Sequence, residues 1–517
     1  MKVLLLYRDR DFGANAEGPP NAADLTQDLE LEVLLGAMAA ADDFLLDVAR
    51  KVLFASLCDS AAILYRQQIL EDCLARPDVI RNVYAIAVEA VERERKVWGW
   101  MSSRDSPRSA LYRAVEVLQI FVGLLKRLRK IARDIAVDFR SEGFGRFFEM
   151  LAAELGDEYL LLVEDHLRRL EFRDGVLMTA QLGAANKGTN YILRKRPSMR
   201  RSWTEKIQDW VDQLTGRDGA EFVYEIADRD EGGFRALSEL RDRGIAHVAA
   251  ALAQSTDHIL AFFQTLRWEL GFYIGCMNLQ GRLERTTAPV CFPKPLPEED
   301  LGFSARGLYD VCLRLNVGGN VVGNDVTTEG KTLVMITGAN RGGKSTFLRS
   351  VGLAQVMMQC GMFVPAEALR ANICDGIFTH FKREEDATMK SGKLDEELSR
   401  MNAIVAQVKP NSLVLFNESF ASTNEREGSE IARQIVRALL ESGVKVFYVT
   451  HLYDLARGFY RANMDAALFL RAERLPSGQR TFRIVAGEPL RTSYGEDLYQ
   501  RIFNSVDDHE EVTPPHD

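Results

Sequence analysis

The stretch of sequence that decides the fold is Thr337-Gly338-Ala339-Asn340-Arg341-Gly342-Gly343-Lys344-Ser345-Thr346. It fits the pattern G-x-x-x-x-G-K-[ST], in which glycines let backbone N–H groups turn inward around phosphates. An apolar run at residues 333–336 enters it, and an apolar-periodic segment that begins at Lys344 leaves it. With a strand before it and a helix after it, the stretch predicts a phosphate-binding loop rather than a chance glycine-rich turn.

The residues of this loop suggest how a nucleotide would be held. Lys344 is expected to reach the β and γ phosphates, and the Ser345 hydroxyl is expected to ligate Mg²⁺. The N-terminus of the following helix adds a favourable dipole. ATP and Mg²⁺ are therefore the predicted cofactors. The predicted nucleotide contacts in the loop are Gly338, Asn340, Gly342, Gly343, Lys344, Ser345 and Thr346.

Around the loop, short β-rich runs alternate with helical segments. The expected strands are residues 333–337, 373–381, 412–416 and 444–450, and the expected helices are 344–360, 394–408 and 428–441. This alternation predicts an α/β layer with a largely parallel sheet, here called a P-loop ATPase domain and bounded at residues 301–504.

A second apolar strand, residues 412–416, ends in Asn417-Glu418. P-loop ATPases place a metal-supporting Asp and a water-orienting Glu at such a strand end. This chain keeps Glu418 but has Asn417, whose carbonyl oxygen can face a Mg²⁺-bound water without adding negative charge. The sequence predicts Asn417 at the metal and Glu418 in catalysis, with weakened metal binding and slow hydrolysis. The alternative is a strand end with a surface Asn-Glu pair.

A histidine, His451, follows the strand at residues 444–449. At that strand end a histidine can sense the γ-phosphate or place the attacking water. A single histidine is more often structural, but beside the loop and Glu418 we predict a catalytic role.

The N-terminal half has a different pattern, mostly helical from residue 29 to about residue 279. Expected helices cover residues 29–48, 61–73, 79–97, 110–136 and 246–279, and their length suggests levers. Residues 174–244 are read as an inserted arm, and residues 1–28 as a short strand and a loop. The predicted organisation is thus mostly α-helical over 29–300, α/β over 301–504, and a disordered acidic tail over 505–517.

Composition limits the remaining possibilities. The chain has 517 residues, 46% of them hydrophobic, which is enough for several domains. It contains no run of about 18 apolar residues, so no membrane partner is expected. Its seven cysteines are scattered without a C-x-x-C pair, which favours reduced thiols and a cytoplasmic location. The net charge of −9 does not favour nucleic acid as a partner, although a local basic face can still bind it.

The C-terminal third, about residues 308–503, resembles the ATPase domain of MutS proteins, the DNA mismatch-repair ATPases of the ABC class. The loop resembles the family's T-G-P-N-M-G-G-K-S-T, with Ala339 and Arg341 as departures. The other resembling segments are Asn324-Asp325, residues 361–366 (family G-x-x-V-P-A), 377–379 (I-F-T-R), 412–418 (S-L-V-L-M-D-E), 450–451 (A-T-H) and 493–495 (S-Y-G).

Two further segments bear on subunit pairing. Residues 390–398 stand where the family has S-T-F-x-x-E-M, with Ser391 or Gly392 opposite the signature serine. In the family this segment opens a helix whose N-terminus meets the γ-phosphate bound by the other subunit. The resemblance therefore implies a homodimer with composite sites, to which Ser391 contributes. After Glu418 the family reads I-G-R-G-T-S, whereas residues 419–424 here read S-F-A-S-T-N, a departure at the segment that bears on communication between subunits.

The N-terminal helices resemble the MutS core and lever region. Because lever-like helices begin near residue 29, we expect a short family member that lacks the mismatch-reading domain. The predicted function is an ATPase that couples ATP hydrolysis to DNA binding without dedicated mismatch recognition. The alternative is an ATP-gated binding or scaffold protein with weak hydrolysis that acts on a protein partner.

One local feature supports DNA as the partner. The arm contains a basic cluster that can contact phosphates without sequence preference, formed by Arg194, Lys195, Arg196, Arg200 and Arg201. A solvated loop is an equally good interpretation of this cluster.

Overall fold

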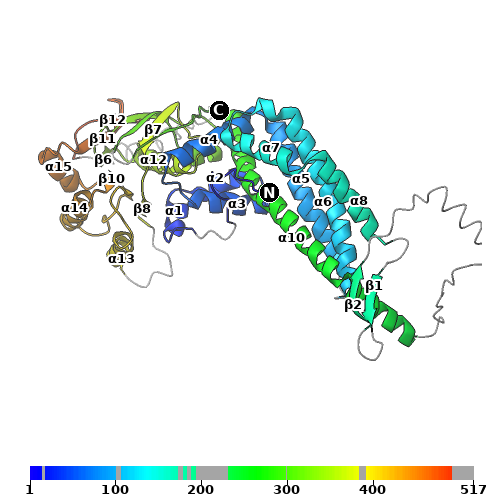
Figure 1. Cartoon of the computed structure of the whole chain (residues 1–517). Helices are drawn as coiled ribbons and strands as arrows, with labels where there is room; N and C mark the ends of the chain where they lie inside the picture. The colour runs from blue at the N-terminus through cyan, green and yellow to red at the C-terminus, as the bar shows by residue number, and fades with distance from the viewer. Residues whose placement is uncertain are drawn as a thin grey trace, which may run out of the picture. The chain divides into compact units, whose positions relative to one another are not determined.

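The computed structural model describes residues 1–13, 18–100, 106–172, 178–182, 188–193, 231–297, 300–383 and 392–491. A helical N-terminal region is followed by a mixed α/β region (Figure 1). The chain separates into two compact units. The first is Met1, Val83–Ala136 and Phe148–Arg267, and the second is Lys2–Asn82, Val137–Phe147 and Trp268–Asp517.

The first unit is built mainly from long helices. Within it, α5, α6 and α8 run side by side (Figure 1), and a small antiparallel hairpin joins β1 to β2. Its elements are α6 (Pro107–Ile135), α8 (Asp157–Leu170), β1 (Met178–Leu182), β2 (Gly188–Leu193) and parts of α5 (Pro77–Trp100), α7 (Glu142–Glu154) and α10 (Glu231–Glu284).

The sequence of α6 shows why such a helix forms. Ser106 caps it by accepting a hydrogen bond from the Ser109 N–H at 3.2 Å, and Pro107 occupies the first helical position. Its buried residues recur at helical spacing along one broad face: Leu111, Ala114, Val115, Val117, Leu118, Phe121, Val122, Leu124, Leu125, Leu128 and Ala132. Within this unit Phe121 packs on Phe263 of α10, with ring centroids 5.4 Å apart.

The second unit begins with four helices, α1 (Ala22–Asp28), α2 (Leu31–Ala39), α3 (Asp43–Phe54) and α4 (Ser60–Ala75). A short 3-10 helix, η1 (Ala136–Asp138), lies at the unit boundary. The prediction of a single helix over residues 29–48 is wrong, because two helices, α2 and α3, cover this range. The chain breaks at Ala40 and Ala41, whose φ angles are 49° and 70°, and Asp42 caps a new helix by accepting from the Phe44 N–H at 2.8 Å.

The short strand predicted near the N-terminus is not formed. Side chains, rather than another strand, satisfy this backbone. Glu269 accepts from the N–H groups of Leu5 and Leu6 at 2.6 and 3.1 Å, and Tyr273 donates to the Leu5 carbonyl at 2.5 Å. The helix predicted over 246–279 extends to Glu231–Glu284, so its first residues lie in the range assigned to the arm.

The α/β part of the second unit contains a six-stranded sheet in the order β12-β11-β6-β10-β9-β8. Its neighbours pair in parallel except β12, which runs antiparallel to β11, as the prediction of a largely parallel sheet requires. The strands are β6 (Leu333–Gly338), β8 (Ile377–Phe381), β9 (Leu413–Asn417), β10 (Lys445–Val449), β11 (Ala467–Arg474) and β12 (Arg480–Ala486).

A smaller sheet in the order β3-β7-β4-β5 belongs to the same unit. It is formed by β3 (Lys294–Leu296), β7 (Ala368–Asn372), β4 (Phe303–Leu308) and β5 (Asn324–Thr327), and α11 (Val311–Val317) follows β4.

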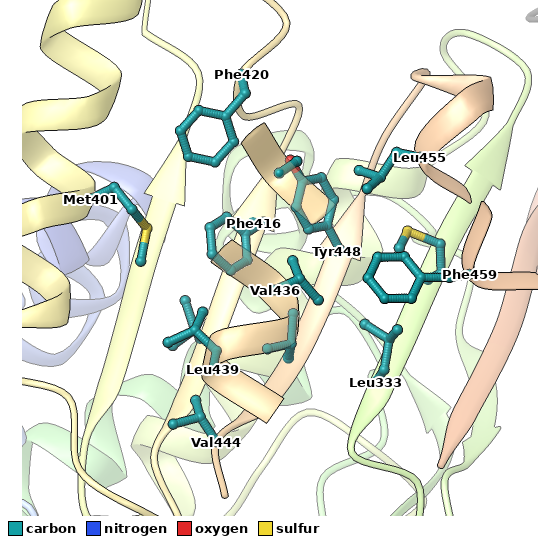
Figure 2. Packing of buried hydrophobic residues seen from close by; sticks show 14 of the residues in the cluster. Leu333, Met401, Phe416, Phe420, Val436, Leu439, Val444, Tyr448, Leu455 and Phe459 are labelled. Carbon is teal, nitrogen blue, oxygen red and sulfur yellow. The ribbon is translucent and has the colours of Figure 1, made fainter. Parts of the chain in front are cut away.

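Helices cover both faces of the large sheet. On one face, α13 (Lys393–Val405), α14 (Glu425–Glu441) and α15 (Tyr453–Arg461) pack on alternate strand residues, including Phe416 and Tyr448, whose rings stack 4.8 Å apart (Figure 2). On the other face lies α12 (Lys344–Gln359), which contacts β6, β9 and β10. It approaches so closely that a Cβ on Gly352 would meet Leu415 at 2.7 Å. This packing fixes the first turn of α12 beside the carboxyl ends of the strands.

Candidate functional site

The glycine-rich loop joins the inner strand β6 to α12. Its backbone is left-handed at three positions, with φ of 110° at Gly338, 57° at Arg341 and 90° at Gly343. Gly343 precedes the first helical residue, and no side chain caps that helix end. Free N–H groups at the start of a helix, preceded by a loop of this curvature, form an anion-binding concavity.

At two positions of the loop, Gly338 and Gly342, the hairpin of β11 and β12 comes so close that only glycine fits. A Cβ on Gly338 would lie 2.9 Å from the Ala472 backbone N, and one on Gly342 would lie 2.7 Å from the Ala472 Cβ. No side chain fits at either position without a shift of the backbone. The loop is therefore packed directly against this hairpin.

The Lys344 side chain folds back beneath the loop. Its Nζ donates to the carbonyls of Gly338 and Ala339, both at 3.1 Å, and the residue is buried. Burial lowers the pKa of Lys344 from its ordinary value, while the nearby Glu418 carboxylate opposes this. The ammonium is thus held at the loop by two carbonyl contacts that a phosphate oxygen can replace.

Ser345 and Asn417 come together from different elements. The Ser345 hydroxyl donates to Asn417 Oδ1 at 2.9 Å. Asn417 is the last residue of β9, which is separated from β6 by β10 in the sheet. Because parallel strands end at the same edge of a sheet, the end of β9 lies beside the first turn of α12. Two neutral oxygens face one another here.

Glu418 and His451 lie at the ends of adjacent parallel strands. Glu418 adopts a left-handed backbone, with φ of 55°, and its N–H donates to the Val449 carbonyl at 2.9 Å. Its Oε2 is 3.8 Å from His451 Nδ1, and both side chains are about one-third exposed. Contact with His451 is the largest cause that lowers the pKa of Glu418, and Lys344 contributes a weaker attraction. A charged carboxylate therefore faces the loop at neutral pH.

A cavity of about 300 Å³ adjoins the loop, and the sequence alone did not indicate it. It is lined by Arg341, Gly343 and Thr346 of the loop and by the ring of Phe482 from β12, among others. Asn324 holds β12 in place, since its Oδ1 accepts from the Ile484 N–H at 2.7 Å. In the sequence, the resemblance of Asn324-Asp325 to the family pattern singles out Asn324, but it does not reveal that this residue contacts β12.

Arg480 is a second residue that sequence reasoning missed. It is the first residue of β12, and its Nε donates to the Asn340 carbonyl at 3.3 Å. Its positive charge also contributes to lowering the pKa of Lys344, after burial. Arg480 therefore adds positive charge beside the glycine-rich loop.

Several predicted residues lie outside the described ranges. These are Ser391 of the signature segment and the basic cluster Arg194, Lys195, Arg196, Arg200 and Arg201. Gly392 is described and directly precedes α13, whose N-terminus has no side-chain cap.

Across the described parts of the chain, no three His, Cys, Asp or Glu side chains are grouped so as to hold a metal ion. The oxygen atoms near the loop are instead the hydroxyl of Ser345 and the amide oxygen of Asn417. Nor does any described helix combine the length and the apolar composition needed to cross a bilayer.

Two family models match the chain. Residues 58–286 match the model described as the MutS2 N-terminal domain, and residues 334–500 match the one described as MutS domain V. The second range covers the glycine-rich loop, Asn417, Glu418 and His451. Domain V is the ATPase domain of MutS proteins, so fold and site together place this region in the class of MutS ATPase domains.

Known relatives agree with both matches. The DNA mismatch repair protein MutS of Thermotoga maritima is 35% identical over 336 residues, which cover 64% of this chain and 41% of the relative. Endonuclease MutS2 of Lacticaseibacillus casei is 34% identical over 177 residues, or 34% of this chain and 22% of the relative. MutS protein homolog 4 of Mus musculus is 30% identical over 170 residues, which cover 33% of this chain and 17% of the relative.

The chain belongs to the MutS family. Its match spans less than half of the length of each of these relatives.

Proposed function

We propose that this chain binds and hydrolyses ATP at the loop between β6 and α12 and couples that cycle to DNA binding. The observation that carries the proposal is a convergence of groups from three strand ends. Lys344 lies beneath the loop, Ser345 contacts Asn417 at 2.9 Å, and Glu418 lies beside His451. Residues 301–504 form the ATPase domain in this proposal.

Each part of the nucleotide has a matching feature. The phosphates follow the loop, where N–H groups and Lys344 supply positive potential. The base enters the cavity of about 300 Å³ and lies against Phe482, whose ring is half exposed. Loop glycines Gly338, Gly342 and Gly343 keep the backbone close to the phosphates, with Asn340 and Thr346 beside them.

Mg²⁺ fits the donors that are present. The Ser345 hydroxyl and the Asn417 amide oxygen are hard oxygen ligands of the type this ion prefers. When bound, the ion would offset the phosphate charge. Asn417 adds no negative charge of its own, so we propose weaker metal binding and slow turnover. Glu418 orients the attacking water, and His451 holds Glu418 in its charged form.

The catalytic unit in this proposal is a homodimer with composite sites. Gly392 precedes α13, whose first N–H groups have no side-chain cap. Ser391 and this helix end would meet the phosphates bound by a second copy of the chain, as the family resemblance implies.

DNA is the proposed partner because relatives in the family include a DNA mismatch repair protein and an endonuclease. The helices of residues 58–286, which match the MutS2 N-terminal domain, would respond to closure of the ATPase domains. We propose that matched and mismatched duplexes bind alike and that the basic arm cluster contacts phosphates.

A second candidate function is favoured by one observation. Asn417 stands where a metal-supporting Asp is usual, and its Oδ1 accepts a hydrogen bond from the Ser345 hydroxyl at 2.9 Å. A site with little hydrolysis would serve as an ATP-gated scaffold for a protein partner.

A binding panel distinguishes the two functions. Homoduplex, mismatched, branched and single-stranded DNA are titrated at fixed salt, with and without ATP and Mg²⁺, while turnover is measured in parallel. The proposed function predicts measurable turnover and ATP-dependent binding to at least one DNA. Absence of DNA binding in every nucleotide state at low salt would favour the protein-partner function.

A further inference from the structure

A buried polar cluster lies behind Glu418, outside the site described above. Its centre is His380 on β8, which is fully buried. One ring nitrogen, Nδ1, lies 2.7 Å from the hydroxyl of Ser419, the residue that follows Glu418. The other, Nε2, lies 2.9 Å from the backbone carbonyl of Glu397 in α13. A single imidazole therefore bridges the loop after β9 and the helix α13.

The direction of these two hydrogen bonds follows from the charge of the ring. Burial, followed by the nearby charge of Arg400, lowers the pKa of His380 to about 4. A neutral imidazole has one donor and one acceptor nitrogen. Because the Glu397 carbonyl only accepts, Nε2 carries the proton, and Nδ1 is left as an acceptor that faces the Ser419 hydroxyl. That hydroxyl also donates to the backbone carbonyl of His380 at 2.5 Å, so its one proton is shared between this carbonyl and Nδ1. The His380 ring and the Ser419 hydroxyl thus tie β8, the loop after β9 and α13 together.

Further contacts hold the same loop to α13 and to the neighbouring strands. The Ser422 hydroxyl donates to Glu397 Oε1 at 2.9 Å. The His380 ring stacks on Phe420, with centroids 5.2 Å apart and an interplanar angle of 20°. On the strand side, Tyr448 donates to the Ser419 carbonyl at 2.8 Å.

The backbone of this loop needs such support. Glu418 and Phe420 have φ angles of 55° and 60°, a region that costs side-chain-bearing residues free energy. A strained conformation persists only when its surroundings determine it. The contacts through His380 and Glu397 supply that determination, so the orientation of Glu418 depends on where α13 lies.

We propose that His380 is a positioning residue that locks the loop carrying Glu418 to α13, so that the two move together. This inference rests on the proposed function, in which the N-terminus of α13 faces the nucleotide of a second copy. Engagement of that nucleotide then sets the Glu418 carboxylate in the same subunit. Residues 419–422 take part in this coupling through their contacts with His380 and Glu397.

The direct test is His380→Phe, which keeps the ring and its stacking on Phe420 but removes both hydrogen bonds. We expect kcat for ATP hydrolysis to fall about tenfold or more, the effect of losing roughly one to two buried hydrogen bonds. The KM for ATP should stay within about twofold, because His380 touches neither the loop nor the cavity beside Phe482. His380→Gln, which keeps a donor for the Glu397 carbonyl, should restore part of kcat.

A double-mutant cycle examines the route of the effect. If His380 acts through Ser419, then His380→Phe and Ser419→Ala should be strongly non-additive in log kcat. Lys445→Met is the matched control. Lys445 is a buried polar residue at the opposite end of the same sheet, bonded to Asn372, so its loss should lower thermal stability without lowering kcat.

The outcomes separate this inference from the function on which it rests. If the wild type neither binds nor hydrolyses ATP, the proposed function is wrong and the inference is lost with it. If the wild type hydrolyses ATP and a folded His380→Phe retains its kcat, only the inference is overturned. A loss of kcat matched by Lys445→Met at equal loss of stability also overturns it. Should His380→Phe fail to fold, His380→Gln and Ser419→Ala carry the same test.

Discussion

At the scale of single residues, the contact between Ser345 and Asn417 distinguishes this site. The sequence predicted both residues at the metal, since each occupies a recognisable place in its own motif. It could not give the 2.9 Å separation, which depends on how β9 and α12 meet across β10. It also gave no signal for Arg480, because that residue reaches the loop only through the antiparallel return of β12.

The first prediction concerns the missing charge at Asn417. We expect Asn417→Asp to lower the Mg²⁺ concentration for half-maximal ATPase activity by roughly tenfold, because two charges at about 4 Å attract by ~1–4 kcal/mol at the surface of a protein. A magnesium titration of turnover measures this. Asn424→Asp is the control, since it adds the same charge at the exposed cap of α14. Identical titrations for wild type and Asn417→Asp would show that this residue does not limit metal binding.

At the scale of elements, the hairpin of β11 and β12 forms one side of the proposed nucleotide site. Ala472 excludes side chains at Gly338 and Gly342, Phe482 lines the cavity, and Arg480 contacts Asn340. The order of strands and helices around the loop could be predicted from periodicity. The contribution of this hairpin could not, because it comes from residues that are distant in sequence and belong to no local pattern.

The N-terminal segment illustrates the same limit. The apolar run at residues 3–6 predicted a strand, yet Glu269, Tyr273 and Tyr65 hold its backbone instead. These side chains, more than sixty residues away, and the nearby Asp11, which accepts from the N–H groups of Val3 and Leu4, take the place of a neighbouring strand. The apolar pattern of the run does not indicate this.

The second prediction tests the hairpin. Arg480→Gln removes a positive charge beside the loop, so we expect ATP and ADP affinity to fall about tenfold, within the range for a charge-assisted contact. Isothermal titration would measure both affinities. Arg483→Gln serves as the matched control, because Arg483 is exposed on the same strand and lines a different groove. Equal affinities for wild type and Arg480→Gln would remove this residue from the site.

At the scale of the whole molecule, one chain combines a region that matches MutS domain V with helices that match the MutS2 N-terminal domain. The helix α10 contributes residues to both compact units, as do α5 and α7. The sequence predicted the helical class of this region and its order relative to the α/β domain. It gave no boundary between the units, because the division falls inside continuous helices that have no local break in pattern.

The third prediction concerns DNA. Changing Arg194, Lys195 and Arg196 to Ala should weaken binding to all DNA sequences alike. It should also flatten the slope of log K against log salt by up to about three, since each phosphate contact contributes roughly 0.9. Fluorescence anisotropy at several salt concentrations measures this slope. Matched and mismatched duplexes should bind almost equally, and a strong mismatch preference would refute that part of the proposal.

The central claim is that Lys344 and its loop hold the phosphates of ATP. The most direct measurement compares ATP binding and turnover in the wild type, Lys344→Ala and Lys331→Ala, the last changing a lysine before the amino end of β6. The account predicts that Lys344→Ala stays folded but loses turnover by a factor of about 10² or more, with much weaker ATP binding, while Lys331→Ala behaves as wild type. Turnover in Lys344→Ala equal to that of the wild type would contradict the assignment of this loop.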